Sequence, residues 1–141
     1  MTREEKDILI FELCSRLPYE VTLFCQMDDE DTGEIKTLSG IEVKDDDVFT
    51  DDGCTYDIEY VKPLLYPISE LTEEDNKELL DQYLDVGLKE SLENTFEVKD
   101  ALKPNYAQVK WLYEHHIDFN GLIEKGLAIN KIDEETFEIY F

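Results

Sequence analysis

The chain has 141 residues, of which 36 are Asp or Glu and 13 are Lys or Arg, so its formal net charge is −23. Because affinity for nucleic-acid phosphates and anionic lipids comes mainly from Lys and Arg, this charge argues against a protein that binds either directly. Hydrophobic residues make up 42% of the chain, which is enough for a core, and no apolar run approaches the roughly 20 residues of a membrane-spanning helix.

The cysteines and the first residues predict a cytoplasmic protein. Cys14, Cys25 and Cys54 are an odd number, which favours free thiols in a reducing compartment over a disulfide framework. The opening residues, Met-Thr-Arg-Glu-Glu, are unlike the start of a signal peptide.

The first predicted element is a helix over residues 3–16. Thr2 and Glu5 have the spacing of a capping box, in which each side chain accepts a hydrogen bond from the backbone N–H of the other residue. Pro18 ends the helix, because proline lacks the N–H that a helix interior requires. The side chains that recur at the spacing of one buried helix face are Ile10, Leu13, Cys14 and Leu17.

From residue 19 to residue 60, apolar and polar residues alternate as in β-strands. Strands are predicted over residues 21–27, 35–43 and 56–60, with a short extended segment at Val48 and Phe49 and acidic turns in between. Sequential strands joined by short turns favour a meander, so we expect a small curled antiparallel sheet on which the first helix packs. Within the last strand, Asp57 and Glu59 would lie on one face, about 6.6–6.8 Å apart.

Residues 61–71 contain Pro63 and Pro67, which a central strand tolerates poorly. We expect this segment at an edge of the sheet or outside it. It is also the predicted boundary between residues 1–66, a helix with a small sheet, and residues 67–141, a mostly helical part. The two parts form either one continuous core or two.

Two further helices are predicted in the C-terminal part. Thr72 caps the first helix, which ends at Gly87, and the second begins at Asn105. Alternating apolar residues over 127–132 and 137–141 predict a short terminal hairpin. The whole pattern predicts an α+β fold.

Three segments of the chain resemble an uncharacterised family of small acidic proteins from gut Bacteroidales and their phages. They are residues 13–21 (LCSRLPYEV), residues 61–69 (VKPLLYPIS) with 71–74 (LTEE), and residues 115–128 (HHIDFNGLIEKGLA). Tyr66 stands where the family has a basic residue, and Ile117 stands where it has Phe. The resemblance implies a bacterial or phage cytoplasmic setting and a link to mobile elements. It implies no activity, cofactor or catalytic residue.

Few residues have the spacing of a catalytic or metal site. His115 and His116 are adjacent, so on a helix they point about 100° apart and cannot share a metal ion as a pair four residues apart can. Residues 28–33 match the start of a calcium loop, but Ser39 stands where that loop needs a bidentate Glu. Residues 121–126 are predicted as a helical turn between glycines rather than a cofactor loop. No nucleophile, phosphate-loop or dinucleotide motif is present, so we predict no catalytic residue, metal or cofactor.

The negative charge is concentrated in two regions. Residues 28–60 contain thirteen acidic and two basic residues, net −11, and residues 70–100 contain eleven acidic and three basic residues, net −8. The predicted partner-binding residues are Asp45, Asp46, Asp47, Asp51, Asp52, Asp57 and Glu59.

These features predict a non-enzymatic interaction protein of a phage or mobile element that binds a basic protein partner. In its sharpest form the prediction is inhibition of a host defence nuclease by nucleic-acid mimicry, because 23 charges correspond to about 39 Å of duplex DNA. The alternative is a small metal-dependent enzyme or metal-binding domain that uses the acidic loops with His115 and His116. A purely structural or assembly role is a third possibility.

Overall fold

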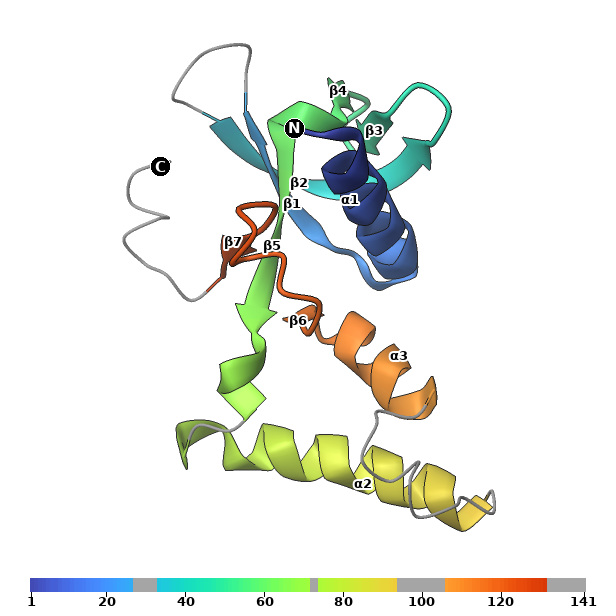
Figure 1. Ribbon diagram of the computed structural model, residues 1–141, viewed down its shortest axis with the longest axis vertical. Helices are drawn as coiled ribbons and strands as arrows, with labels where there is room; N and C mark the ends of the chain where they lie inside the picture. Colours follow the sequence, from blue (N-terminus) through green and yellow to red (C-terminus); the bar gives the residue numbers. More distant parts are fainter. Residues whose placement is uncertain (27–32, 72–73, 94–105, 132–141) are drawn as a thin grey trace.

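A computed structural model describes residues 1–26, 33–71, 74–93 and 106–131 of the chain. Within these residues, helix α1 (Arg3–Arg16) lies against a seven-stranded sheet, and helices α2 (Lys77–Glu93) and α3 (Tyr106–Glu114) form the opposite end of the molecule (Figure 1). The predicted α+β class is confirmed.

Helix α1 has the predicted bounds and the predicted capping box. The N–H of Glu5 donates to the Thr2 hydroxyl (3.1 Å), and the N–H of Thr2 donates to the Glu5 carboxylate (3.0 Å). The side chains that α1 buries are Leu9, Ile10, Glu12, Leu13 and Arg16. Because this face is centred on Leu9 and Leu13, Cys14 points away from the sheet and is exposed, so its predicted place in the core is wrong.

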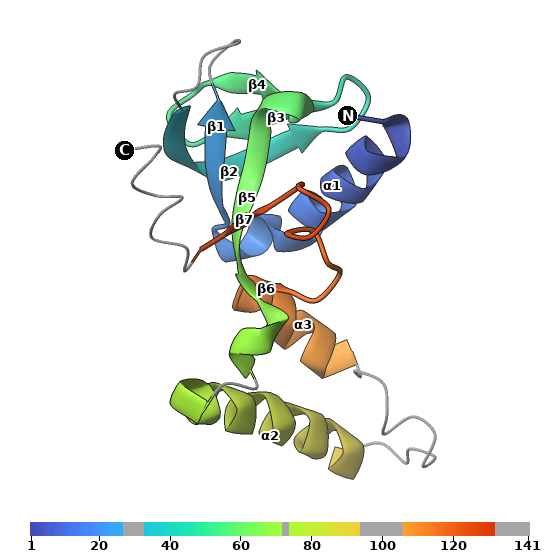
Figure 2. The same cartoon turned by 60° about the vertical axis from the view of Figure 1, so that its left-hand side comes forward.

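The sheet is mixed and open. Its strands are β1 (Thr22–Gln26), β2 (Gly33–Glu42), β3 (Asp47–Thr50), β4 (Thr55–Asp57), β5 (Val61–Pro67), β6 (Ile117–Asp118) and β7 (Ile129–Asn130). The order is β4-β3-β2-β1-β5-β6, and β7 also pairs with β5. Strands β1 to β4 form the predicted antiparallel meander, whereas β6 and β7 pair with β5 in parallel. These C-terminal strands extend the sheet beyond β5 instead of closing it, so the predicted curled, all-antiparallel sheet is wrong (Figure 2).

Strand β5 lies inside the sheet, although its two prolines predict an edge or a crossing segment. It pairs with β1 through Val61 to Pro63 and with β6 and β7 only from Leu64 onward. Pro63 therefore lies where β5 has a neighbour on one side alone, so its missing N–H can face the unpaired side. Pro67 is the last residue of the strand.

The predicted strand over residues 56–60 is also interrupted. Strand β4 ends at Asp57, and η2 (Ile58–Tyr60) is a 3-10 turn whose first N–H groups Asp57 caps, with the N–H of Glu59 3.0 Å from its carboxylate. Ile58 is fully buried. Asp57 and Glu59 therefore do not share a strand face, and the regular spacing predicted for them is wrong.

Two hydrophobic clusters fill the fold. The first lies between α1 and the sheet and includes Leu122, Leu127 and Ala128 from the C-terminal part. The second contains Leu71, Trp111, Leu112 and Ile117 and joins α2 to α3. Strand β5 contributes to both, with Leu65 in the first cluster and Tyr66 packed against the second.

The C-terminal elements differ from the predictions at their ends. The chain passes through the 3-10 turns η3 (Ile68–Leu71) and η4 (Glu74–Asn76) before α2 begins, and α2 continues through Gly87 to Glu93. A glycine inside a helix costs only about 1 kcal/mol, so Gly87 does not have to end α2. Strand β7 pairs with β5. Thr72, Asn105 and residues 132–141 lie outside the described residues, and with them the second half of the predicted terminal hairpin.

Candidate interaction surface

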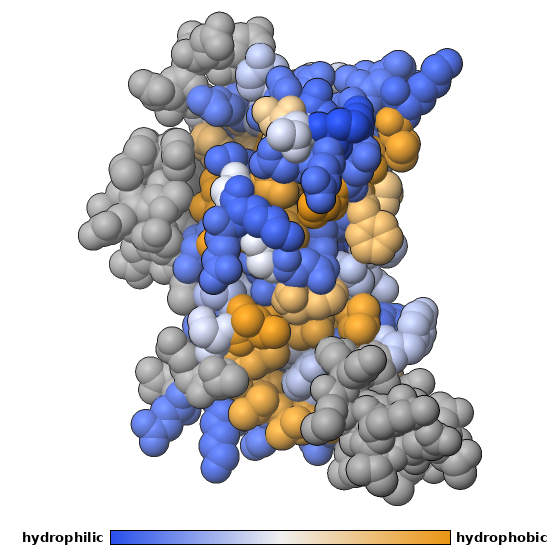
Figure 3. Space-filling model, viewed as in Figure 1, coloured by the Kyte–Doolittle hydropathy of each residue, from blue (hydrophilic) through white to orange (hydrophobic). Residues whose placement is uncertain are grey.

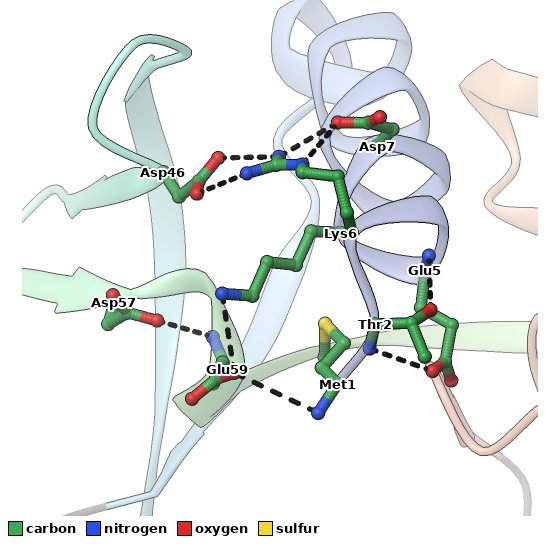
Figure 4. A network of polar contacts seen from close by, with 9 residues as sticks. Met1, Thr2, Glu5, Lys6, Asp7, Asp46, Asp57 and Glu59 are labelled. Carbon is green, nitrogen blue, oxygen red and sulfur yellow. Dashed lines mark hydrogen bonds and ion pairs between the residues drawn. The ribbon is translucent and has the colours of Figure 1, made fainter.

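The turn between β2 and β3 is held against the start of α1 by one of the predicted acidic residues. Asp46 has a φ of +56° and accepts hydrogen bonds from both terminal nitrogens of Arg3, at 2.7 and 2.8 Å (Figure 4). The same guanidinium donates to Asp7 at 3.0 Å. The hydrogen bonds from Arg3 lower the pKa of Asp46. This carboxylate therefore stabilises the contact between helix and sheet.

Glu59 and Asp57 are also engaged. The Glu59 carboxylate accepts from Lys6 Nζ at 3.3 Å and lies 3.8 Å from the amino group of Met1 (Figure 4). Asp57 caps the turn that follows it. Both side chains are exposed, but each already has a local partner.

Asp52 forms the third local ion pair. Lys36 Nζ lies 2.6 Å from the Asp52 carboxylate, and the Thr50 hydroxyl donates to the same group. Lys36 first and Thr50 second hold the pKa of Asp52 well below its usual range. Lys36 also lies 3.4 Å from Glu34 and donates to Cys54 Sγ at 3.3 Å.

The remaining predicted residues, Asp45, Asp47 and Asp51, form no ion pair with any residue that the structure describes. Asp45 and Asp47 cluster with Glu42, and one carboxylate oxygen from each lies within 4.8 Å of the others. The hydrogen bond with Asp45, followed by the negative charge of Asp45, raises the pKa of Glu42. We name Glu42, Asp45 and Asp47, together with Asp51 in the turn at the other end of β3, the hairpin surface.

The sequence pattern missed Glu42 because it belongs to the end of β2 rather than to an acidic turn. Three carboxylates at this spacing could ligate a divalent cation. They are exposed or half-buried and project from one hairpin. Clusters of this kind are common on acidic surfaces without a bound ion.

A second row of acidic side chains follows the outer face of α2. Glu74, Glu78, Asp81 and Asp85 are exposed and recur every three or four residues, which places them on one side of the helix. The hairpin surface and this row lie at opposite ends of the molecule (Figure 1). Among the described residues, these two groups of carboxylates are therefore separate surfaces.

The two histidines directly follow α3, which lies away from the turns between β2, β3 and β4 (Figure 1). The His115 ring stacks on Trp111, with a centroid distance of 4.0 Å, and its Nδ1 lies 2.9 Å from the Trp111 carbonyl oxygen. His116 has a φ of +56°, and its Nε2 lies 2.9 Å from the Tyr19 carbonyl oxygen. Burial lowers the pKa of His116 to about 4. Among the described residues, the group of His, Cys, Asp and Glu side chains close enough to share a metal ion is Glu42, Asp45 and Asp47, and it includes neither histidine.

A buried polar network joins two of the segments that carry the family resemblance. The Arg16 side chain is fully buried, and its Nη2 donates to Glu12 at 3.2 Å and to the Ile117 carbonyl oxygen at 2.8 Å. Asn120 donates to the other carboxylate oxygen of Glu12, and the guanidinium lies 5.0 Å from the Tyr113 ring centroid. The Glu-to-Arg spacing of four residues is visible in the sequence, but the burial of the pair depends on the C-terminal segment.

The glycine-bounded turn closes beside this network. Asp118 is buried and accepts from the N–H groups of Leu122 (2.8 Å) and Ile123 (2.9 Å). The N–H of Leu127 donates to the Leu122 carbonyl oxygen, and Gly126, with a φ of +75°, ends the turn. The predicted turn over residues 121–126 is confirmed, with the N–H of Lys125 3.2 Å from the Gly121 carbonyl oxygen, but it is a hydrogen-bonded turn and not a helix.

A groove of about 730 Å³ runs along the outer face of α1 beside this turn. Ile8 and Phe11 supply its apolar lining, and Phe11 is 64% exposed. Of the five charged residues that line it, Arg3, Asp7 and Glu12 are in ion pairs, whereas Glu4 and Lys125 form no ion pair among the described residues. The free charge of the groove is therefore one acidic and one basic group.

Compared with protein-family models, with curated proteins and with solved structures, the chain has no match. The resemblance to Bacteroidales and phage proteins stays a prediction. Among the helices that the structure describes, none is both long and apolar enough to cross a membrane.

Proposed function

We propose that the protein is a non-enzymatic interaction protein that binds a basic protein partner through its exposed carboxylates. The observation that carries the proposal is that only some of the predicted acidic residues have a cationic partner within the fold. Asp46, Asp52 and Glu59 have local cationic partners, whereas Asp45, Asp47 and Asp51 have none within the described residues, and Asp45 and Asp47 cluster with Glu42.

The hairpin surface holds unneutralised charge in a fixed position. The bonds from Arg3 to Asp46 and from Lys36 to Asp52 fix the two turns that carry it. Carboxylates that repel one another gain most from an incoming Lys or Arg, since it relieves their repulsion as well as pairing with them. A basic partner would therefore associate rapidly and in a salt-sensitive manner.

Inhibition of a defence nuclease of the host by nucleic-acid mimicry is the specific form that we propose for a phage or mobile-element setting. Its support is the total charge and the grouping of the free carboxylates. The regular strand spacing of Asp57 and Glu59 does not contribute, because Asp57 ends β4 and Glu59 pairs with Lys6.

The test is retention of basic proteins from a bacterial lysate at low and high salt. The variant Asp45→Asn/Asp47→Asn/Asp51→Asn removes three charges from the hairpin surface. The control Glu4→Gln/Glu20→Gln/Glu124→Gln removes three exposed charges elsewhere. We expect the wild type and the control to retain a basic partner at low salt, and the hairpin variant to lose it.

Two outcomes contradict the proposal. If the wild type retains no basic protein at low salt, the acidic surface does not bind a partner of this kind. If both variants lose retention equally, the total charge matters and the hairpin surface is not the site.

A further inference from the structure

The α2–α3 end of the molecule has an apolar surface that the fold leaves partly open. Leu79, Leu80, Tyr83 and Val86 pack against the second cluster but remain only half-buried. Leu84 is 52% exposed, and Ile68, in the turn before α2, is 50% exposed. Figure 3 shows apolar side chains gathered over this end, whereas the surface over α1 and the sheet is mostly polar. A contiguous apolar surface of this kind typically marks a binding site.

Apolar and acidic side chains form two parallel strips on α2. Leu80 and Leu84 are four residues apart and so lie on adjacent turns along one line of the helix. Asp81 and Asp85 each follow by one residue and form a neighbouring line at the same spacing. Both aspartates are exposed.

The charge around these strips is strongly negative. Residues 74–86 contain five acidic residues and one Lys, net −4. On α3, Lys110 is 3.7 Å from Glu114, so it is already paired. Beside α2, one carboxylate oxygen of Glu70 accepts from Asn76 at 3.1 Å, and the other is buried without a hydrogen-bond partner. The surface therefore combines exposed apolar side chains with anionic groups that have no cationic partner among the described residues.

We infer that the α2–α3 face binds a basic amphipathic helix of the partner protein. The apolar side of that helix would cover Leu80 and Leu84, and its Lys or Arg side chains would pair with Asp81 and Asp85. The inference rests on the proposed function, since it specifies which part of a basic partner makes contact. A second copy of this chain fits less well, because its net charge of −23 would bring like charges together.

The first experiment uses a synthetic probe. The probe is a peptide of Leu and Lys, about as long as α2, with its leucines at helical spacing. The control peptide has the same composition with Leu and Lys in strict alternation, which gives no apolar helix face. Both are titrated into isotopically labelled protein and followed by the backbone amide signals. We expect tighter binding of the helical peptide and shifts centred on residues 77–86.

Matched variants test the residues. Leu84→Ser should weaken binding of the helical peptide about tenfold, since one large apolar contact is lost at the centre of the interface. Phe11→Ser removes a comparably exposed apolar side chain on α1 and should leave the affinity within about twofold. Asp81→Asn/Asp85→Asn should weaken binding and flatten its salt dependence.

The failures of the two proposals are distinguishable. If the two peptides bind equally, with shifts confined to the hairpin surface, the inference is wrong and the proposed function stands. If neither peptide binds at low salt, both are wrong. If sedimentation shows a dimer that Leu84→Ser dissociates, the face is an interface between copies, and the inference is also wrong.

Discussion

Replacing Arg16 by Met should destabilise the protein far more than replacing Arg3 by Met. Both arginines lie on α1 and each binds a carboxylate, but the Arg16 side chain is fully buried whereas the Arg3 side chain is 58% exposed. Arg16→Met removes the two 3.2 Å bonds to Glu12 and the 2.8 Å bond to the Ile117 carbonyl oxygen. The Glu12 carboxylate then stays buried, with only Asn120 as a donor.

The expected magnitude follows from this burial. Removing one partner of a buried ion pair costs about 3–5 kcal/mol, because an uncompensated charge is left inside. The native pair is not optimal: its bonds to Glu12 are long, and Arg16 Nη1 is buried without a hydrogen-bond partner. We therefore expect a loss near the lower end, about 3 kcal/mol. Arg3→Met removes a pair that water already screens, and its effect should be several-fold smaller.

Urea denaturation followed by circular dichroism measures the free energy of unfolding of Arg16→Met and Arg3→Met against the wild type, and urea adds no salt. The double variant Glu12→Leu/Arg16→Met completes the test. It should be more stable than Arg16→Met, because no charge remains buried. Equal losses for Arg16→Met and Arg3→Met, or a double variant no more stable than Arg16→Met, would refute the reasoning.

Three further predictions concern pH, packing and salt. The folded pKa of His116, about 4, lies below its unfolded value near 6.5, so the unfolded state takes up a proton first and stability falls as pH decreases between these values. His116→Asn, which tolerates the positive φ, should lessen this decline in urea denaturation at several pH values, and an identical decline would contradict the assignment. Gly33→Ala places a Cβ 2.4 Å from the Phe24 ring and 2.6 Å from the Cys25 carbonyl oxygen, so it should lower the free energy of unfolding by about 1–3 kcal/mol. Gly40→Ala, whose nearest contact is at 3.4 Å, should lower it clearly less in the same assay. Raising the ionic strength from about 0.01 to 0.15 M shortens the screening length from about 30 to 8 Å, so the melting temperature should rise, and a flat response would argue against concentrated repulsion.

Local sequence signals were sufficient for the elements that depend on neighbouring residues. The capping box of Thr2 and Glu5, the bounds of α1 and the β1–β3 meander follow from spacing and alternation alone. Strands β6 and β7 could not be predicted in this way. Each has two residues and is a strand only because β5 lies beside it. The place of β5 in the sheet depends on these same distant partners.

The same limit applies to the acidic residues. In the sequence, Asp46 and Asp47 are equivalent neighbours in one turn. In the fold, Asp46 binds Arg3, from 43 residues earlier, whereas Asp47 joins Glu42 and Asp45. Spacing predicts that an acidic turn exists, but only tertiary structure decides which of its carboxylates are neutralised and which stay available to a partner.

The two positions singled out by the predicted family resemblance, Tyr66 and Ile117, are neighbours in space. Tyr66 and Ile117 are register partners in the parallel pair of β5 and β6, and Tyr66 lies under Lys131, with Nζ 5.1 Å from its ring centroid. A basic residue at 66 alone would face the Lys131 ammonium, and Phe at 117 alone would overfill the second cluster, where Ile117 is 1% exposed. Together, an Arg at 66 could lie on the Phe ring at 117.

We therefore predict favourable coupling between Tyr66→Arg and Ile117→Phe. The double variant should lose less free energy of unfolding than the two single variants lose together, by about 0.5–1 kcal/mol. Urea denaturation of the wild type, both single variants and the double variant measures this difference. Losses that add without coupling would mean that the two positions are independent. Coupling would mean that positions 66 and 117 act as one unit in the packing of β5 beside β6.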